Sequence, residues 1–291
     1  MIAPIDGTNH SLAVALLAKG FPCHAAPHWA DALERIRRFG GNAALDLPIG
    51  HVMTIDGQPA GVALTIASRR ADGCPEPQTH INFAAWYVEP AYRWRAPLML
   101  RAVTRMPCDV LTDLTPSDPV RALLPAFGFR QITRGVAITP AALHRGGGRV
   151  LALEAAGADR MAPGLRALLL AHAPFGNIPA LLECRDGTAV ALAFRRLRWR
   201  GLPMARVIYC GSNRKLFDHL GAVSSFLRGH GVALIKLEAP MDMPPPPGWL
   251  RAGRELKFAR GPMPPDVTDY LGSELALLDF DNERPQDAGE A

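Results

Sequence analysis

The hydrophobic pattern of the first half of the chain predicts two helices followed by a series of strands. Asn9 or Ser11 can cap a helix that runs to Lys19, and apolar residues recur at helical spacing in residues 28–39; glycine follows each of these segments. Short apolar runs then flank Asp56-Gly57, a pair typical of the tight turn of a β-hairpin. The pattern predicts strands at 50–55, 60–67, 80–88, 110–114 and 130–138, with helices at 96–105 and 119–126.

A similar order of elements returns after residues 145–149, which contain three glycines and are typical of a linker. A second D-G pair, Asp186-Gly187, predicts another hairpin, and Ser212 is placed to cap a helix. The pattern predicts strands at 150–154, 178–184, 189–196, 205–210 and 232–237, helices at 164–172 and 214–227, an extended break at 244–247, and closing strands at 256–260 and 273–280.

This order predicts an α/β (α+β) fold in which a mixed, mostly antiparallel sheet is flanked by helices, present in two tandem copies. We expect one domain at residues 1–144, a linker at 145–149, a second domain at 150–280 and a disordered tail at 281–291. The alternative is one domain with a long extension, since only the order of elements repeats and no residue-level repeat is visible.

Composition adds few constraints on function. The chain has 291 residues, of which 48% are hydrophobic, and a net charge of +5. Its basic residues are spread along the chain, so a solvated surface is favoured over an anionic partner. Residues 195–200 interleave arginines with Trp199, a pattern that could bind nucleic acid or an acidic acyl carrier protein. Charged side chains that prevent an exposed strand edge from pairing with another chain would explain the pattern as well. Nucleic acid is the least favoured partner.

The cysteines argue against a metal site and a disulfide framework. There are five, widely spaced and without a C-x-x-C pair. A reducing cytoplasm is the simplest setting for such a chain. The apolar stretch at residues 12–18 is too short to cross a membrane, and no later segment reaches that length.

The segment around residues 86–98 carries the chemistry. A strand ends in Val88-Glu89-Pro90, two arginines follow, and a helix begins at once, with Pro97 suited to its first turn. The first turn of a helix has unpaired N–H groups and the positive end of the helix dipole. With Arg93 and Arg95 beside it, residues 93–98 are predicted to bind an anion such as phosphate.

The same segment resembles the GNAT superfamily of acyl-CoA-dependent acyltransferases. In that family a strand ending in V-x-P-x-Y/F-R leads into a pyrophosphate loop, and Val88, Pro90, Tyr92 and Arg93 match it. A G-F pair usually ends a later helix, and here it is Gly128-Phe129. The resemblance covers residues 9–139 well. Over 150–280 it depends on element order and on the string I-Y-C at residues 208–210.

The resemblance implies a cosubstrate, acetyl-CoA or a longer acyl-CoA, bound where the fourth and fifth strands separate, and no metal. It implies an acyltransferase that moves the acyl group from CoA, or from an acyl carrier protein, to the amine or hydroxyl of a small-molecule or carrier-bound substrate by direct attack. The positions that correspond to the family's cofactor contacts are occupied by Tyr87, Val88, Arg93, Trp94, Arg95, Ala96, Leu98 and Ser117.

The candidate catalytic residues are Asp113, Asn82 and His80. Asp113 lies near the end of the fifth strand and is the preferred base. Asn82 stands where some family members have a glutamate, so it would orient water, and His80 titrates in the useful range. Asp113 and His80 also have structural interpretations, as a loop cap and as a surface side chain respectively.

The chain departs from the family pattern at Ala96, where glycine is preferred, at Leu98, where glycine or alanine is preferred, and at Leu124, where a tyrosine acid is usual. These departures keep open an alternative function, a catalytically inactive GNAT-like binding or scaffold protein.

Overall fold

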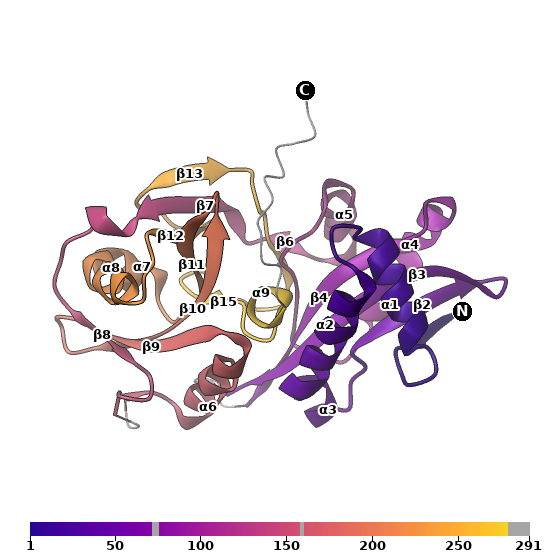
Figure 1. Ribbon diagram of the computed structural model, residues 1–291, viewed down its shortest axis with the longest axis horizontal. Helices are drawn as coiled ribbons and strands as arrows, with labels where there is room; N and C mark the ends of the chain where they lie inside the picture. Colours follow the sequence, from indigo (N-terminus) through magenta and orange to yellow (C-terminus); the bar gives the residue numbers. More distant parts are fainter. Residues whose placement is uncertain (72–75, 158–159, 279–291) are drawn as a thin grey trace. The chain divides into compact units, whose positions relative to one another are not determined.

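The computed structural model describes residues 1–71, 76–157 and 160–278 (Figure 1). The predicted tail at 281–291 lies outside the described residues. Contacts divide the chain into two compact units. The first unit contains Met1–Gln131, Lys257–Pro262 and Gly272–Leu278, and the second contains Ile132–Leu256 and Met263–Leu271.

The first unit is built on a seven-stranded sheet with the order β1-β2-β3-β4-β5-β14-β6. Neighbouring strands are antiparallel except β4 and β5, which are parallel. Positive φ angles at Asp56 (50°) and Gly57 (77°) form the predicted hairpin turn between β2 and β3. The strands are β1 (Ile2–Pro4), β2 (Gly50–Ile55), β3 (Gln58–Arg70), β4 (Gln78–Val88), β5 (Val110–Asp113), β6 (Arg130–Gln131) and β14 (Phe258–Arg260).

Helices of the first unit bury one apolar face. In α2, Trp29, Leu33 and Ile36 are at most 1% exposed, and their spacing is the helical period that the sequence predicted. Gly40, with φ 78°, ends this helix. The helices are α1 (His10–Gly20), α2 (Ala26–Phe39), α3 (Gly41–Ala44), η1 (Pro90–Arg95), α4 (Ala96–Thr104), α5 (Asp118–Leu123), η2 (Leu124–Phe127) and α9 (Glu274–Leu277).

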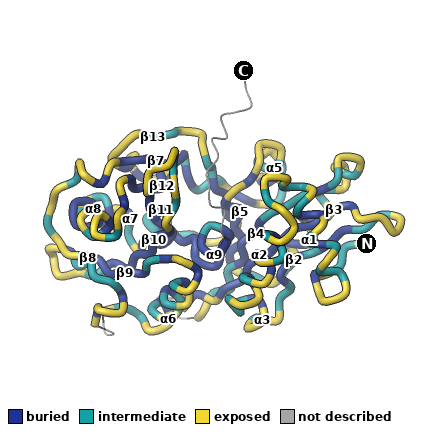
Figure 2. The backbone as a smooth tube through the Cα atoms, in the orientation of Figure 1, coloured by how far each residue is buried: buried dark blue, intermediate teal, exposed yellow. Residues whose placement is uncertain are grey.

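The second unit has its own sheet, with the order β13-β7-β12-β11-β10-β9-β8, and β15 pairs with β11 off this path. Its strands β10 to β12 are largely buried (Figure 2). The strands are β7 (Thr133–Pro140), β8 (Arg149–Ala152), β9 (Asn177–Glu183), β10 (Ala189–Trp199), β11 (Leu202–Cys210), β12 (Leu234–Pro240), β13 (Trp249–Ala252) and β15 (Thr268–Asp269). The helices are η3 (Ala141–Leu143), α6 (Pro163–Ala171), η5 (Ala173–Phe175), α7 (Asn213–Asp218) and α8 (Leu220–Gly229).

Each sheet includes a strand that is distant in sequence from its neighbours. β14 lies between β5 and β6 in the first sheet, and β7 lies between β12 and β13 in the second. The strand predicted at 130–138 is therefore two strands in different sheets. Because β7 belongs to the second unit, contacts divide the chain at Gln131/Ile132 and not at the predicted linker, although residues 144–148 have no regular structure.

Two further predictions were wrong in detail. The segment 273–280, predicted as a strand, contains the short helix α9, because Ser273 takes the extended N-cap conformation and Glu274 lies in the first turn. The helix predicted at 214–227 is divided into α7 and α8 at His219, whose backbone angles (φ −115°, ψ 23°) leave the helical region. The predicted cap is confirmed, since Ser212 accepts a hydrogen bond from the Lys215 amide at 3.3 Å.

No described helix combines the length and apolar character that a membrane span requires. Among the described residues, no three histidine, cysteine or carboxylate side chains gather as a metal ion would need.

Candidate functional site

The candidate site lies in the first unit, where β4 and β5 separate. Their parallel ladder runs from His80↔Val110 to Phe83↔Asp113, but β4 continues to Val88. β5 pairs with one side of β4 at residues 80–83. Within the described part of the first unit, no strand pairs with residues 84–88 on that side. The backbone polar groups on this side have no ladder partner among these strands, and a ligand with amide groups of its own could pair with them.

A β-bulge shapes this free stretch of β4. The register with β3 steps from Val62↔Tyr87 to Leu64↔Ala84, so β4 carries one extra residue. Ala85 within it has φ 44°, a left-handed conformation that costs a non-glycine residue about 1–3 kcal/mol. Bulges of this kind bend a strand and redirect its side chains, and they are frequent beside functional sites.

A buried polar cluster lies where the ladder ends. Asn82 is 2% exposed and donates to Thr112 Oγ1 at 3.2 Å. Its Oδ1 accepts the backbone N–H of Glu274 at 3.2 Å, and Glu274 Oε1 accepts the Thr115 hydroxyl at 3.0 Å. The NH2 group and the carbonyl oxygen of the Asn82 side chain are thus both engaged. Asn82 therefore holds α9 in place, whereas the sequence suggested that it would orient water.

Asp113 is the last residue of β5 and is 5% exposed. Burial raises the pKa of its carboxyl well above the ordinary value, and the nearby Glu274 carboxylate raises that pKa further. Two weaker influences lower this pKa: the Thr115 amide, which donates to Oδ1 at 3.4 Å, and the positive charge of Arg121. The environment favours protonated Asp113, which is a proton donor, although the sequence suggested a base.

Glu274 is the residue that sequence reasoning missed. It is 1% exposed and lies more than 150 positions from Thr115, with which it forms its hydrogen bond. No local motif connects these two segments. The only available signal was a serine followed by an acidic residue, which predicts a helix start and not a site.

His80 lies at the other end of the parallel ladder, opposite Val110. It is half-buried, and its Nε2 is 3.4 Å from Gln78 Oε1. Its ladder position is three residues before that of Phe83↔Asp113, so the structure does not place it in the polar cluster.

Tyr87 and Val88 form the far end of β4. The Tyr87 hydroxyl donates to Glu89 Oε2 at 3.1 Å, and Lys19 Nζ binds Glu89 Oε1 at 2.6 Å. Partial burial and this carboxylate raise the pKa of Tyr87. Gly20 packs so closely that a Cβ there would lie 2.3 Å from Tyr87 Cγ. Val88 is buried and pairs with Gly61 of β3.

The predicted anion site begins directly after β4. Arg93, Trp94 and Arg95 are exposed in η1, and the Arg95 guanidinium lies over the Trp94 ring at 4.0 Å from its centroid. A helix start ordinarily offers four free N–H groups. Here the Ala96 amide donates to the Arg93 carbonyl, and Pro97 has no N–H, so at most two remain.

The last two predicted contacts lie on the surface. Leu98, where the family prefers a small residue, is 43% exposed at the start of α4. Ser117 is exposed at the N-cap of α5, and its side chain makes no capping hydrogen bond. The structure thus groups Arg93, Trp94, Arg95, Ala96 and Leu98 at one helix start, while Asn82 and Asp113 lie at the end of the ladder.

No protein-family model matches the chain, and no curated protein matches it by sequence. Solved structures do. A GCN5-related N-acetyltransferase from Anabaena variabilis has a TM-score of 0.56 at 12% identity, over 89% of this chain and 72% of that one. A GCN5-related N-acetyltransferase from Kribbella flavida has a TM-score of 0.52 at 13% identity, over 89% of this chain and 70% of that one. A putative acetyltransferase from Pyrococcus horikoshii has a TM-score of 0.50 at 12% identity, over 95% of this chain and 92% of that one. At these identities the likeness concerns the fold, and it shows that the chain has the GNAT fold expected from the sequence.

Proposed function

We propose that the first unit binds an acyl-thioester along residues 84–88 of β4 and transfers its acyl group to an amine or hydroxyl. The observation that carries this proposal is the free edge of β4 beyond Phe83↔Asp113, with the bulge at Ala85. A pantetheine arm has two amide groups that can pair with a strand, as a peptide does in β-augmentation. The solved neighbours with this fold include GCN5-related N-acetyltransferases.

The thioester is that of acetyl-CoA or a longer acyl-CoA, with an acyl carrier protein as a second possible donor. The phosphates of CoA would lie at the start of α4, where Arg93 and Arg95 are exposed. Because at most two backbone amides are free there, the arginine side chains must supply most of the attraction.

In the transfer step, the acceptor nitrogen or oxygen bonds to the thioester carbonyl carbon and the carbon–sulfur bond breaks. The leaving thiolate needs a proton, and the acceptor must lose one. Asp113 is buried in a state that favours the protonated carboxyl, so it can donate to sulfur and then, as a carboxylate, take the acceptor's proton. Glu274 beside it helps to set this proton balance.

Calorimetric titration of the full chain with acetyl-CoA and longer acyl-CoAs tests the proposal. Arg93→Ala should weaken binding about tenfold, the loss expected for one charge-assisted phosphate contact. Arg101→Ala, an exposed arginine at the other end of α4, is the matched control and should leave affinity unchanged. No binding to any acyl-thioester would refute the proposal. Binding without transfer to amines or alcohols would favour the inactive scaffold instead.

A further inference from the structure

The second unit repeats the strand separation of the first. β11 and β12 form a short parallel ladder from Met204↔Leu234 to Arg206↔Lys236, and β11 then continues to Cys210. This is the arrangement of β4 and β5, with a hairpin before the long strand and a helix after it. The difference lies beside the free stretch of β11, residues 207–210.

In the second unit, residues 266–271 occupy this edge, and we call them the internal segment. Two of them, Thr268 and Asp269, pair with Cys210 and Tyr209 as strand β15. The Tyr270 amide then donates to the Ile208 carbonyl at 2.8 Å. The backbone groups of β11 that a pantetheine arm would use are thus bonded to the chain itself.

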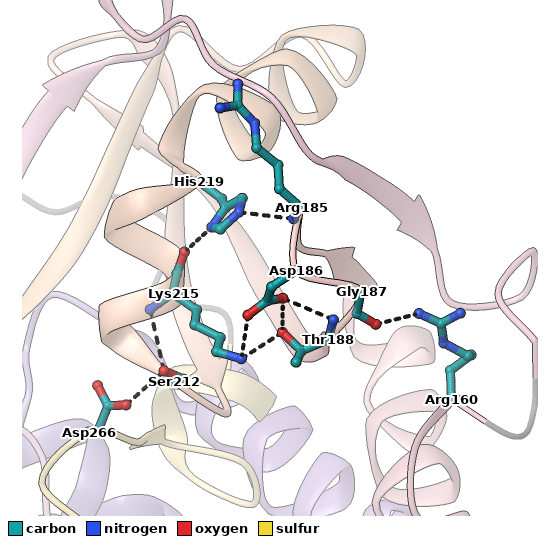
Figure 3. A network of polar contacts seen from close by, with 9 residues as sticks. All are labelled: Arg160, Arg185, Asp186, Gly187, Thr188, Ser212, Lys215, His219 and Asp266. Atoms are coloured by element: carbon teal, nitrogen blue, oxygen red, sulfur yellow. Dashed lines mark hydrogen bonds and ion pairs between the residues drawn. The ribbon is translucent and has the colours of Figure 1, made fainter.

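The same segment fills the helix start that follows β11. Asp266 Oδ2 accepts the Ser212 hydroxyl at 2.7 Å (Figure 3). Its Oδ1 accepts the Arg214 amide at 2.8 Å, and its carbonyl accepts the Asn213 amide at 2.7 Å. A carboxylate is the kind of group that a helix start attracts, and it satisfies the donors that a phosphate would need.

Lys215 connects this helix start to the second D-G turn. Its amide donates to Ser212 Oγ, while its Nζ donates to Thr188 Oγ1 at 2.6 Å and lies 3.5 Å from Asp186 Oδ2 (Figure 3). The first residues of α7 are therefore fixed by the internal segment and by the β9–β10 turn together.

The inner end of the segment is anchored in a buried charged cluster. Tyr270 is 2% exposed, and burial and then the Glu238 carboxylate raise the pKa of its hydroxyl. Nearby on the ladder, Arg206 and Lys236 both bind Glu255, with Lys236 Nζ 2.6 Å from Oε1. Thr268 adds a buried hydrogen bond to Asn213 Oδ1 at 2.9 Å. Displacing the segment would expose Tyr270 and break the buried hydrogen bond between Thr268 and Asn213.

We infer that the internal segment is a permanent intramolecular occupant of the second unit's strand edge, so that the chain binds one acyl-thioester, in the first unit. This inference depends on the proposed function for the identity of the ligand. It gives the second unit a structural role in which the chain supplies, through Asp266 and Thr268–Tyr270, the contacts that a thioester would otherwise make.

Titration calorimetry with acetyl-CoA, combined with hydrogen exchange of the full chain, tests the inference. We expect one acetyl-CoA per chain. The amides of Tyr270, Asn213 and Arg214 should be protected without ligand and equally protected with saturating acetyl-CoA. Asp266→Ala should increase exchange at these amides without adding a second binding event, whereas the control Asp242→Ala, an exposed aspartate of the same unit, should leave exchange unchanged.

Two acetyl-CoA molecules per chain, or loss of protection at Tyr270 on adding acetyl-CoA, would overturn the inference. If neither acetyl-CoA nor any longer acyl-thioester binds, the proposed function fails and exchange alone decides the inference. Protection of the Tyr270, Asn213 and Arg214 amides would then support permanent occupancy, and exchange at the rate of exposed amides would overturn it.

Discussion

Replacing Asp113 by asparagine should make the protein more stable and less active. Asparagine keeps the shape of the side chain and its acceptor oxygen for the Thr115 amide, but it cannot ionise or carry a transferable proton. Asp113 is 5% exposed, and burial and Glu274 both disfavour its carboxylate. Replacement by asparagine removes the free-energy cost of burying this ionisable carboxyl, and it also removes the proton donor.

The sign of the effect follows from linkage. The pKa of Asp113 is higher in the folded chain than in the unfolded chain, whose carboxyl has a pKa of about 4. As pH rises above about 4, the unfolded chain loses this proton before the folded chain does, and stability falls. This loss of folding stability grows until the pH reaches the pKa of Asp113 in the folded chain. Asp113→Asn has no ionisable carboxyl and does not incur the loss.

We expect Asp113→Asn to gain about 2 kcal/mol at pH 7.5, a typical size for the desolvation penalty of one buried polar group. For a unit of this size the gain corresponds to a rise in Tm of roughly 4–8 °C. The gain should nearly vanish at pH 4. Thermal unfolding at both pH values measures it, and acyl transfer to a panel of amines should slow by at least about tenfold.

The control for this experiment is the exposed Asp109→Asn, on the loop before β5, although its Oδ2 accepts the Thr79 amide at 2.7 Å. That variant should lose a little stability with no change in transfer. Equal destabilisation of Asp113→Asn at pH 4 and pH 7.5, with transfer unaffected, would refute both the electrostatic reasoning and the assigned role.

Other perturbations probe the packing around the site and the second unit. Gly20→Ala should lower the stability of the first unit by about 1–3 kcal/mol, because its methyl group would overlap the Tyr87 ring; thermal unfolding checks this against Gly7→Ala, where nothing lies within 4 Å. Glu255→Gln should cost about 3–5 kcal/mol, since it removes the negative charge of a carboxylate that buried Arg206 and Lys236 both bind. Urea denaturation measures that loss, and exposed Glu154→Gln should show none of it.

Local sequence signals predicted much of the fold because they act over a few residues. The pairs Asp56-Gly57 and Asp186-Gly187 each lie between the hairpin strands that they predicted. A third hairpin turn was missed, since Arg200 (φ 50°) precedes Gly201 (φ 82°) and arginine is not a typical residue for that conformation. Turn chemistry is therefore readable where the usual residues are present.

The rest depended on pairings between distant segments. Nothing near residues 133–140 indicates that this strand pairs with β12, or that residues 258–260 pair with β5. The same limit applies to the site. The sequence placed Asp113 near the end of its strand, but the pKa of Asp113 depends on its burial and then on Glu274, and both of these result only from the fold.

The most direct test of the account is hydrogen exchange of the β4 amides with and without acetyl-CoA. We predict that acetyl-CoA slows exchange at residues 84–88 in the first unit, while residues 207–210 of β11, already bonded to the internal segment, do not change. Slower exchange at 207–210 with no change at 84–88 would contradict the assignment of the acyl-thioester to the free edge of β4.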